Sequence, residues 1–124
     1  MNSNLKKLGT EPFPNFTDKF DWLGILAAMP SFEQHCAEAR ERFGKPYAEV
    51  HQWLDEFAGE QPYGMRHRKK RHHLAGIEEV RRLWGDEAAE AARQHIIADL
   101  KLEGWRETDP FPKDEQHYQR MGLF

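Results

Sequence analysis

Apolar side chains recur every three or four residues along much of the chain, and this spacing places them on one face of an α-helix. Four segments show the pattern; in the third, the apolar positions are Leu74, Ile77, Val80, Leu83 and Trp84. No segment alternates apolar and polar residues as a half-buried strand does. The pattern therefore predicts an all-α protein, an antiparallel bundle of about four helices with extended N- and C-terminal arms.

Capping residues and helix breakers set the ends of the predicted helices. Ser31 is a favourable N-cap and Gly44 a favourable terminator, so the first helix is expected between them. Pro46 suits the first turn of a second helix, and Gly85 separates the third from the fourth. The expected ranges are 31–43, 46–59, 66–84 and 86–104, preceded by a short helix over 20–29.

Prolines interrupt both ends of the chain, where EPFP (11–14) returns as DPFP (109–112). Proline disfavours regular helix, so residues 1–20 and 105–124 are expected to be extended arms on a core of about 21–104, within a single domain 1–124. The arms either pack on their own bundle or bind a protein partner.

Composition narrows the classes of function. Four tryptophans and eight phenylalanines argue against a disordered chain, and a net charge of −3 makes nucleic acid a less expected partner. The single cysteine excludes an internal disulfide, and no apolar run is long enough to cross a bilayer or resembles a signal peptide. We therefore expect a cytoplasmic protein with no membrane contact.

Basic charge is concentrated in RHRKKRHH, residues 66–73. Guanidinium groups bind phosphate well, so Arg68 and Arg71 are candidate ligands for a small phosphate-containing substrate. The alternative is a solvated helix face whose charges pair with nearby acids.

Histidines provide the clearest candidate chemistry. His51 and His95 are each followed four residues later by an aspartate, Asp55 and Asp99, and such pairs lie about 6 Å apart on one helix face. Each pair can bind a cation, or the acid can orient the imidazole. The full set of candidate metal ligands is His35, His51, Asp55, His72, His73, His95 and Asp99. Nitrogen and oxygen ligands suit a divalent zinc, manganese, iron or nickel ion.

Two functions remain open. In the first, the protein is a metal-dependent hydrolase of a phosphate ester or nucleotide, in which the metal activates water and Glu79 or His67 acts as general acid or base. In the second, the histidines and acids form a structural hydrogen-bond network in a non-enzymatic interaction module or small accessory subunit.

Three motifs over residues 32–100 resemble a bacterial and phage domain of unknown function: H51-x-W53-x-D55, then RHR-x-x-RHH-x-x-GI (66–77), then H95-I96-x-x-D99. That resemblance implies an all-α fold and no known activity. The order of histidines and aspartates is more weakly similar to that of HD-type metal phosphohydrolases, which implies a metal-bound phosphohydrolase site. The contiguous His-Asp pair of those enzymes is not present in this chain, so the similarity does not by itself predict a dinuclear site.

Overall fold

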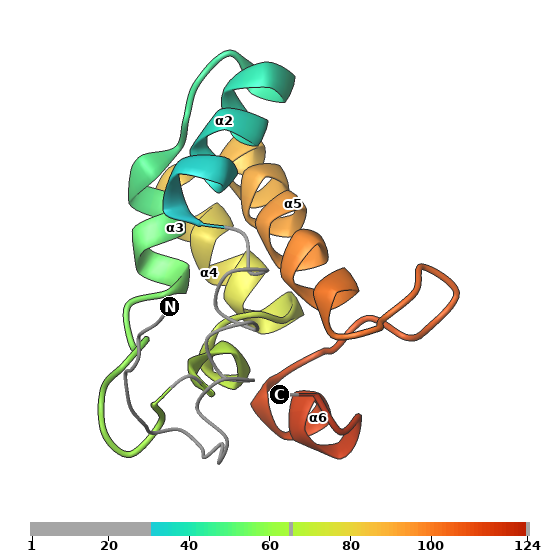
Figure 1. The fold of residues 1–124 in the computed structure, drawn as a ribbon. Helices are drawn as coiled ribbons and strands as arrows, with labels where there is room; N and C mark the ends of the chain where they lie inside the picture. The colour runs from blue at the N-terminus through green and yellow to red at the C-terminus, as the bar shows by residue number, and fades with distance from the viewer. Residues whose placement is uncertain (1–30, 65, 124) are drawn as a thin grey trace, which may run out of the picture.

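The computed structural model describes residues 31–64 and 66–123, in which the helices gather into a bundle (Figure 1). The elements are α2 (Phe32–Phe43), α3 (Ala48–Leu54), the 3-10 helix η1 (His67–Lys70), α4 (Leu74–Trp84), α5 (Asp86–Leu102) and α6 (Glu115–Arg120). The described residues contain no strand, so the predicted all-α bundle is confirmed. The helix expected over 20–29 and the N-terminal arm lie outside the described residues.

Helix α5 is the centre of the bundle, and α2, α3 and α4 all pack against it (Figure 1). Its N-terminal half is rich in alanine, and these small side chains allow neighbouring backbones to approach closely. The fully buried residues of α5 that form this core are Ala88, Ala89, Ala92, Ile96 and Leu100. Among the described helices, none is long and apolar enough to cross a membrane.

The first two helices begin close to where the sequence places them. Ser31 caps α2 by accepting a hydrogen bond from the backbone N–H of Gln34, and the Gln34 side chain accepts one from the Ser31 N–H. Gly44 ends α2 with a φ of 82°, which glycine adopts without strain. Helix α3 ends at Leu54, earlier than the expected Gly59, so Asp55 becomes its C-cap.

The expected continuous helix over 66–84 is wrong, because the chain bends between η1 and α4. His73 is extended, and its Nδ1 accepts a hydrogen bond from the backbone N–H of Gly76. The first two N–H groups of α4, from Leu74 and Ala75, donate to the carbonyls of Pro112 and Lys113 in the C-terminal segment. These contacts satisfy N–H groups that a continuous helix would bond internally. The bend turns residues 67–73 away from the axis of α4.

The C-terminal segment is less irregular than expected, because it contains α6 and is anchored to the bundle. Tyr118 of α6 is 1% exposed, and its hydroxyl donates a 3.1 Å hydrogen bond to Glu103. Trp105 is also buried, and its indole N–H donates to the carbonyl of Pro110. Residues 105–123 therefore pack on their own domain, next to η1.

Candidate metal centre

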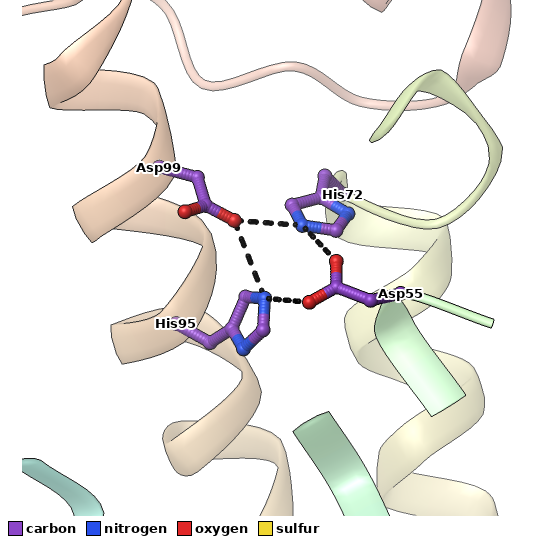
Figure 2. Close-up of side chains that lie close together, drawn as sticks. All are labelled: Asp55, His72, His95 and Asp99. Carbon is purple, nitrogen blue, oxygen red and sulfur yellow. Dashed lines mark hydrogen bonds and ion pairs between the residues drawn. The ribbon is translucent and has the colours of Figure 1, made fainter. Parts of the chain in front are cut away.

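Four polar side chains converge in the interior of the bundle: Asp55, His72, His95 and Asp99. One donor atom of each lies within 4.8 Å of the donors of the other three. Figure 2 shows them facing one another, with His95 and Asp99 on α5, Asp55 at the end of α3 and His72 in the bend before α4. The break in the expected helix thus brings His72 to the cluster.

Four nitrogen–oxygen distances within this cluster are close to those between ligands of one cation. His72 Nε2 lies 3.0 Å from Asp99 Oδ2 and 3.4 Å from Asp55 Oδ1. His95 Nε2 lies 3.3 Å from Asp99 Oδ2 and 3.4 Å from Asp55 Oδ2. Zinc binds nitrogen and oxygen at about 2.0–2.2 Å, so adjacent ligands in a tetrahedron are roughly 3.3–3.6 Å apart. The distances of 3.3–3.4 Å match that spacing, whereas the 3.0 Å contact between His72 and Asp99 would have to lengthen around such an ion.

His51 fixes which nitrogen of His95 carries a hydrogen. The Nε2 of His51 lies 2.9 Å from the carbonyl of Pro46, an acceptor only, so Nε2 must donate. Burial and the neighbouring His95 and His35 lower the pKa of His51 to about 4, so its Nδ1 is an acceptor at neutral pH. That atom lies 3.0 Å from His95 Nδ1, which therefore donates. The Nε2 of His95 is left to bind either a proton or a metal ion between the two aspartates.

The charges of the cluster suit a bound cation. Burial alone would lower the pKa of His95, but Asp55 and Asp99 raise it to about 9. Burial lowers the pKa of His72 to about 4 despite its contact with Asp99. For both carboxyl groups, burial opposes ionisation, yet the adjacent histidines hold their pKa values well below the ordinary range. The site thus contains two carboxylates, and the space between them favours a positive charge.

Two further histidines flank the four central residues. His35 of α2 places its Nε2 3.4 Å from Asp99 Oδ1, and His67 of η1 places its Nε2 3.0 Å from Asp55 Oδ1. The Nδ1 atoms of His35, His67 and His72 are buried and have no hydrogen-bond partner among the described groups. The polar contacts of these three rings are therefore directed at the carboxylates.

Solvent reaches the cluster at one member. His72, His95 and Asp99 are at most 3% exposed, whereas the side chain of Asp55 is 35% exposed. An ion or a water molecule would therefore enter at the Asp55 end. This arrangement differs from a fully enclosed structural metal site, because one edge of the ligand set faces water.

Three of the predicted metal ligands have other positions or neighbours than expected. His73 lies outside the cluster, because its Nδ1 caps α4 and its Nε2 contacts the carbonyls of Lys69 and Lys70. His51 contacts the cluster only through His95. Asp55, predicted to pair with His51 on one helix, instead contacts His67, His72 and His95, because α3 ends before it.

The predicted substrate and acid–base residues are also placed differently from expectation. Arg68 is 3% exposed and lies between Glu103, at 2.9 Å, and Asp99, at 3.6 Å. Arg71 donates to the carbonyl of Trp53 and lies over its indole ring. Both guanidinium groups are engaged within the fold rather than displayed as a phosphate-binding face. Of the acid–base candidates, His67 lies against Asp55, whereas Glu79 forms an ion pair with Arg82 on α4.

Two contributors to the site were not singled out from the sequence. Glu103 neutralises the guanidinium beside Asp99, and the backbone carbonyl of Pro46 sets the tautomer of His51. Glu103 follows Asp99 by one helical turn, a spacing that could have suggested a shared face. No sequence signal identifies the carbonyl of Pro46, because every residue has one.

Comparison with known families gives one result. The model of a family described as "Domain of unknown function (DUF6915)" matches residues 29–104. The chain belongs to this family. The DUF6915 match spans α2 to α5 and includes the four residues of the cluster together with His35 and His67. It confirms the expected family of unknown function. No curated protein and no solved structure matches the chain. The similarity to HD-type phosphohydrolases stays a prediction.

Proposed function

We propose that this DUF6915 domain binds a divalent metal ion through Asp55, His72, His95 and Asp99. The observation that carries the proposal is the convergence of these four side chains, with one donor atom of each within 4.8 Å of the others. The nitrogen–oxygen distances of 3.0–3.4 Å are close to the spacing of adjacent ligands around one cation. The hydrogen bond of His95 Nδ1 to His51 supports it, because it leaves Nε2, which faces both carboxylates, to exchange its proton for a metal ion. Two imidazoles and two carboxylates suit zinc, manganese, iron or nickel.

The expected metal-binding behaviour can be measured on the full-length chain without a histidine tag. Elemental analysis should find stoichiometric metal, and a chelator should lower the melting temperature. Asp99→Asn should abolish metal binding, because Asp99 contacts both central imidazoles. Glu79→Gln is the matched control, since Glu79 pairs with Arg82 and should leave binding unchanged. Absence of metal, with no effect of added metal or chelator on melting, would refute the proposal.

The chemistry that such a site supports best is hydrolysis. A bound divalent cation would lower the pKa of a coordinated water and polarise an ester oxygen. Asp55 gives water access to this position, and His67 is the acid–base candidate next to it. A phosphate ester or nucleotide remains the proposed substrate class, although Arg68 and Arg71 do not support it. The test is chelator-sensitive release of nitrophenol from p-nitrophenyl phosphate esters, absent in Asp99→Asn; turnover that survives this substitution would exclude the centre as its source.

A second candidate function is an interaction module in which the cluster is structural. The observation that favours it is the continuous internal network from Asp99 through Arg68 and Glu103 to Tyr118. In that case the partner would bind elsewhere, for example on the terminal arms. This candidate predicts a metal-free protein whose melting temperature does not respond to chelator.

A further inference from the structure

We propose that the two flanking histidines, His35 and His67, are positioning residues of a centre with one cation, and that neither of them binds the ion. This inference rests on the proposed metal binding and extends it. His35 faces Oδ1 of Asp99, and His67 faces Oδ1 of Asp55. Each flanking histidine thereby occupies one oxygen of a carboxylate and directs the other oxygen, Oδ2, to the ion.

The four imidazoles differ in how many carboxylates they reach. The two central rings, those of His72 and His95, each place Nε2 within 3.4 Å of an oxygen of both aspartates. Each flanking ring reaches a single aspartate within the described part of the chain. In a tetrahedral site every ligand neighbours all the others, so a ligand has to lie near both carboxylates. The central imidazoles meet this requirement and the flanking imidazoles do not.

The stacking of His35 on His95 also assigns His35 a role other than ligand. The ring centroids lie 3.6 Å apart and the planes are 13° apart. The lone pairs of an imidazole lie in its ring plane, so two stacked, nearly parallel rings cannot direct them at one ion. The Nε2 of His35 instead lies 3.4 Å from Asp99 Oδ1. In Figure 2, Asp99 turns its other oxygen, Oδ2, to His72 and His95.

His67 holds Asp55 in the corresponding way. Its Nε2 lies 3.0 Å from Asp55 Oδ1, a hydrogen-bond distance, while Asp55 Oδ2 lies 3.4 Å from His95 Nε2. The side chain of Asp55 is 35% exposed, so packing alone constrains this carboxylate less than it constrains buried Asp99. Oδ1 also lies 3.4 Å from His72 Nε2, so loss of the hydrogen bond from His67 would free Oδ1 to bind the ion as well.

The charges of the site match one divalent cation. The adjacent histidines hold the pKa values of Asp55 and Asp99 well below the ordinary range, so the two carboxylates together carry two negative charges. Arg68 lies beside Asp99, but Glu103 lies 2.9 Å from the guanidinium and offsets its charge. A histidine that donates from Nε2 in its neutral form adds no charge to this balance.

The test is a competition titration of the untagged full-length chain with Zn²⁺ against a chromophoric chelator. His35→Phe and His67→Phe keep a flat ring and remove the donor, so we expect affinity to fall about 10- to 100-fold while one ion per chain is retained. The loss should be larger for His67→Phe, because Arg68 still faces Asp99 Oδ1 in His35→Phe. His35→Gln and His67→Gln keep an N–H near the position of Nε2 and should recover most of the affinity.

Infrared spectra of the carboxylate stretches supply a readout that a merely structural role would not move. Binding through one oxygen separates the antisymmetric and symmetric stretches widely, and binding through both oxygens narrows the separation. The separation should be wide in wild type and narrower in His67→Phe, where Asp55 Oδ1 is freed. His117→Phe is the matched control, because His117 contacts Lys113 at α6 and should keep wild-type affinity and spectrum. Circular dichroism checks that each variant keeps its helices.

The outcomes separate this inference from the proposed function. A glutamine is a poor ligand for zinc, so equal losses of affinity in the glutamine and phenylalanine variants would overturn the positioning role and leave metal binding intact. Wild-type affinity and an unchanged infrared spectrum in both phenylalanine variants would overturn it as well. Where a phenylalanine variant does not fold, the glutamine variant decides, because near-wild-type affinity supports the role and a large loss contradicts it. No binding of Zn²⁺ or Mn²⁺ to wild type would overturn the inference and the proposed function together.

Discussion

His51 provides the sharpest test of how the centre is organised, because its hydrogen bond to His95 is its polar contact with the proposed ligands. We expect His51→Phe to weaken metal binding while keeping a flat ring beside His35 and Phe32. The substitution removes the 2.9 Å hydrogen bond to Pro46 and the 3.0 Å contact with His95. His95 then lacks the acceptor that holds its hydrogen on Nδ1.

The size of the effect follows from these two contacts. Loss of a group that orients a metal-binding histidine typically lowers affinity about 10- to 100-fold, or about 1.4–2.7 kcal/mol. The N–H of His95 would also be left buried without an acceptor, which costs about 1–3 kcal/mol of folding stability. The metal-free variant should therefore be less stable than wild type.

The measurements are a competition titration against a chromophoric chelator and nitrogen-15 spectra of the histidine rings. Wild type should show hydrogen on Nε2 of His51 and a hydrogen-bonded proton on Nδ1 of His95, and the variant should lose the downfield shift that the bond to His51 gives this second proton. His51→Gln should recover part of the affinity, because its amide can both donate and accept. Wild-type affinity and an unchanged His95 spectrum in His51→Phe would refute the reasoning.

Three further predictions test the fold and the centre. Gly76→Ala should destabilise the protein by about 1–3 kcal/mol in urea unfolding, because its Cβ would lie 1.9 Å from the carbonyl oxygen of Arg71; an unchanged midpoint would contradict the bend as described. Arg68→Met should lower the free energy of unfolding in urea by about 3–5 kcal/mol, since it removes the buried guanidinium that pairs with Glu103 and lies beside Asp99, whereas replacing a phosphate-binding surface arginine would change it very little. Chelation should lower the melting temperature by about 10 °C for a protein initially at a hundredfold excess of metal over Kd; calorimetry of the metal-loaded and chelated protein measures this.

The sequence predicted the helical segments best where local signals agree. Ser31 and Gly44 bound α2 because a side-chain cap and a left-handed terminator act within a few residues. The break before α4 could not be predicted in the same way. The first N–H groups of α4 donate to the carbonyls of Pro112 and Lys113, which are far away in the sequence. Helical periodicity alone therefore extended the third helix too far.

The residues of the candidate site were predictable from the sequence only where their contacts are local. His95 and Asp99 lie one turn apart inside a regular helix, so their contact followed from spacing. Asp55 and His72 reach the cluster only because α3 ends early and the chain bends before α4. Arg68 was interpreted as a surface group because a helix over 66–84 would have exposed it. Arg68 is buried against Asp99 and Glu103, and composition alone cannot place these two acids beside it.

The donors of the centre come from three separate stretches of backbone: the end of α3, the bend before α4, and α5. An ion bound there would join these stretches much as a disulfide does, in a chain whose single cysteine cannot form one internally. During synthesis, the nascent polypeptide cannot complete this joint until Asp99 has left the ribosome. Metal capture would therefore be a late step of maturation, and cells starved of the ion would accumulate a looser, more protease-sensitive form.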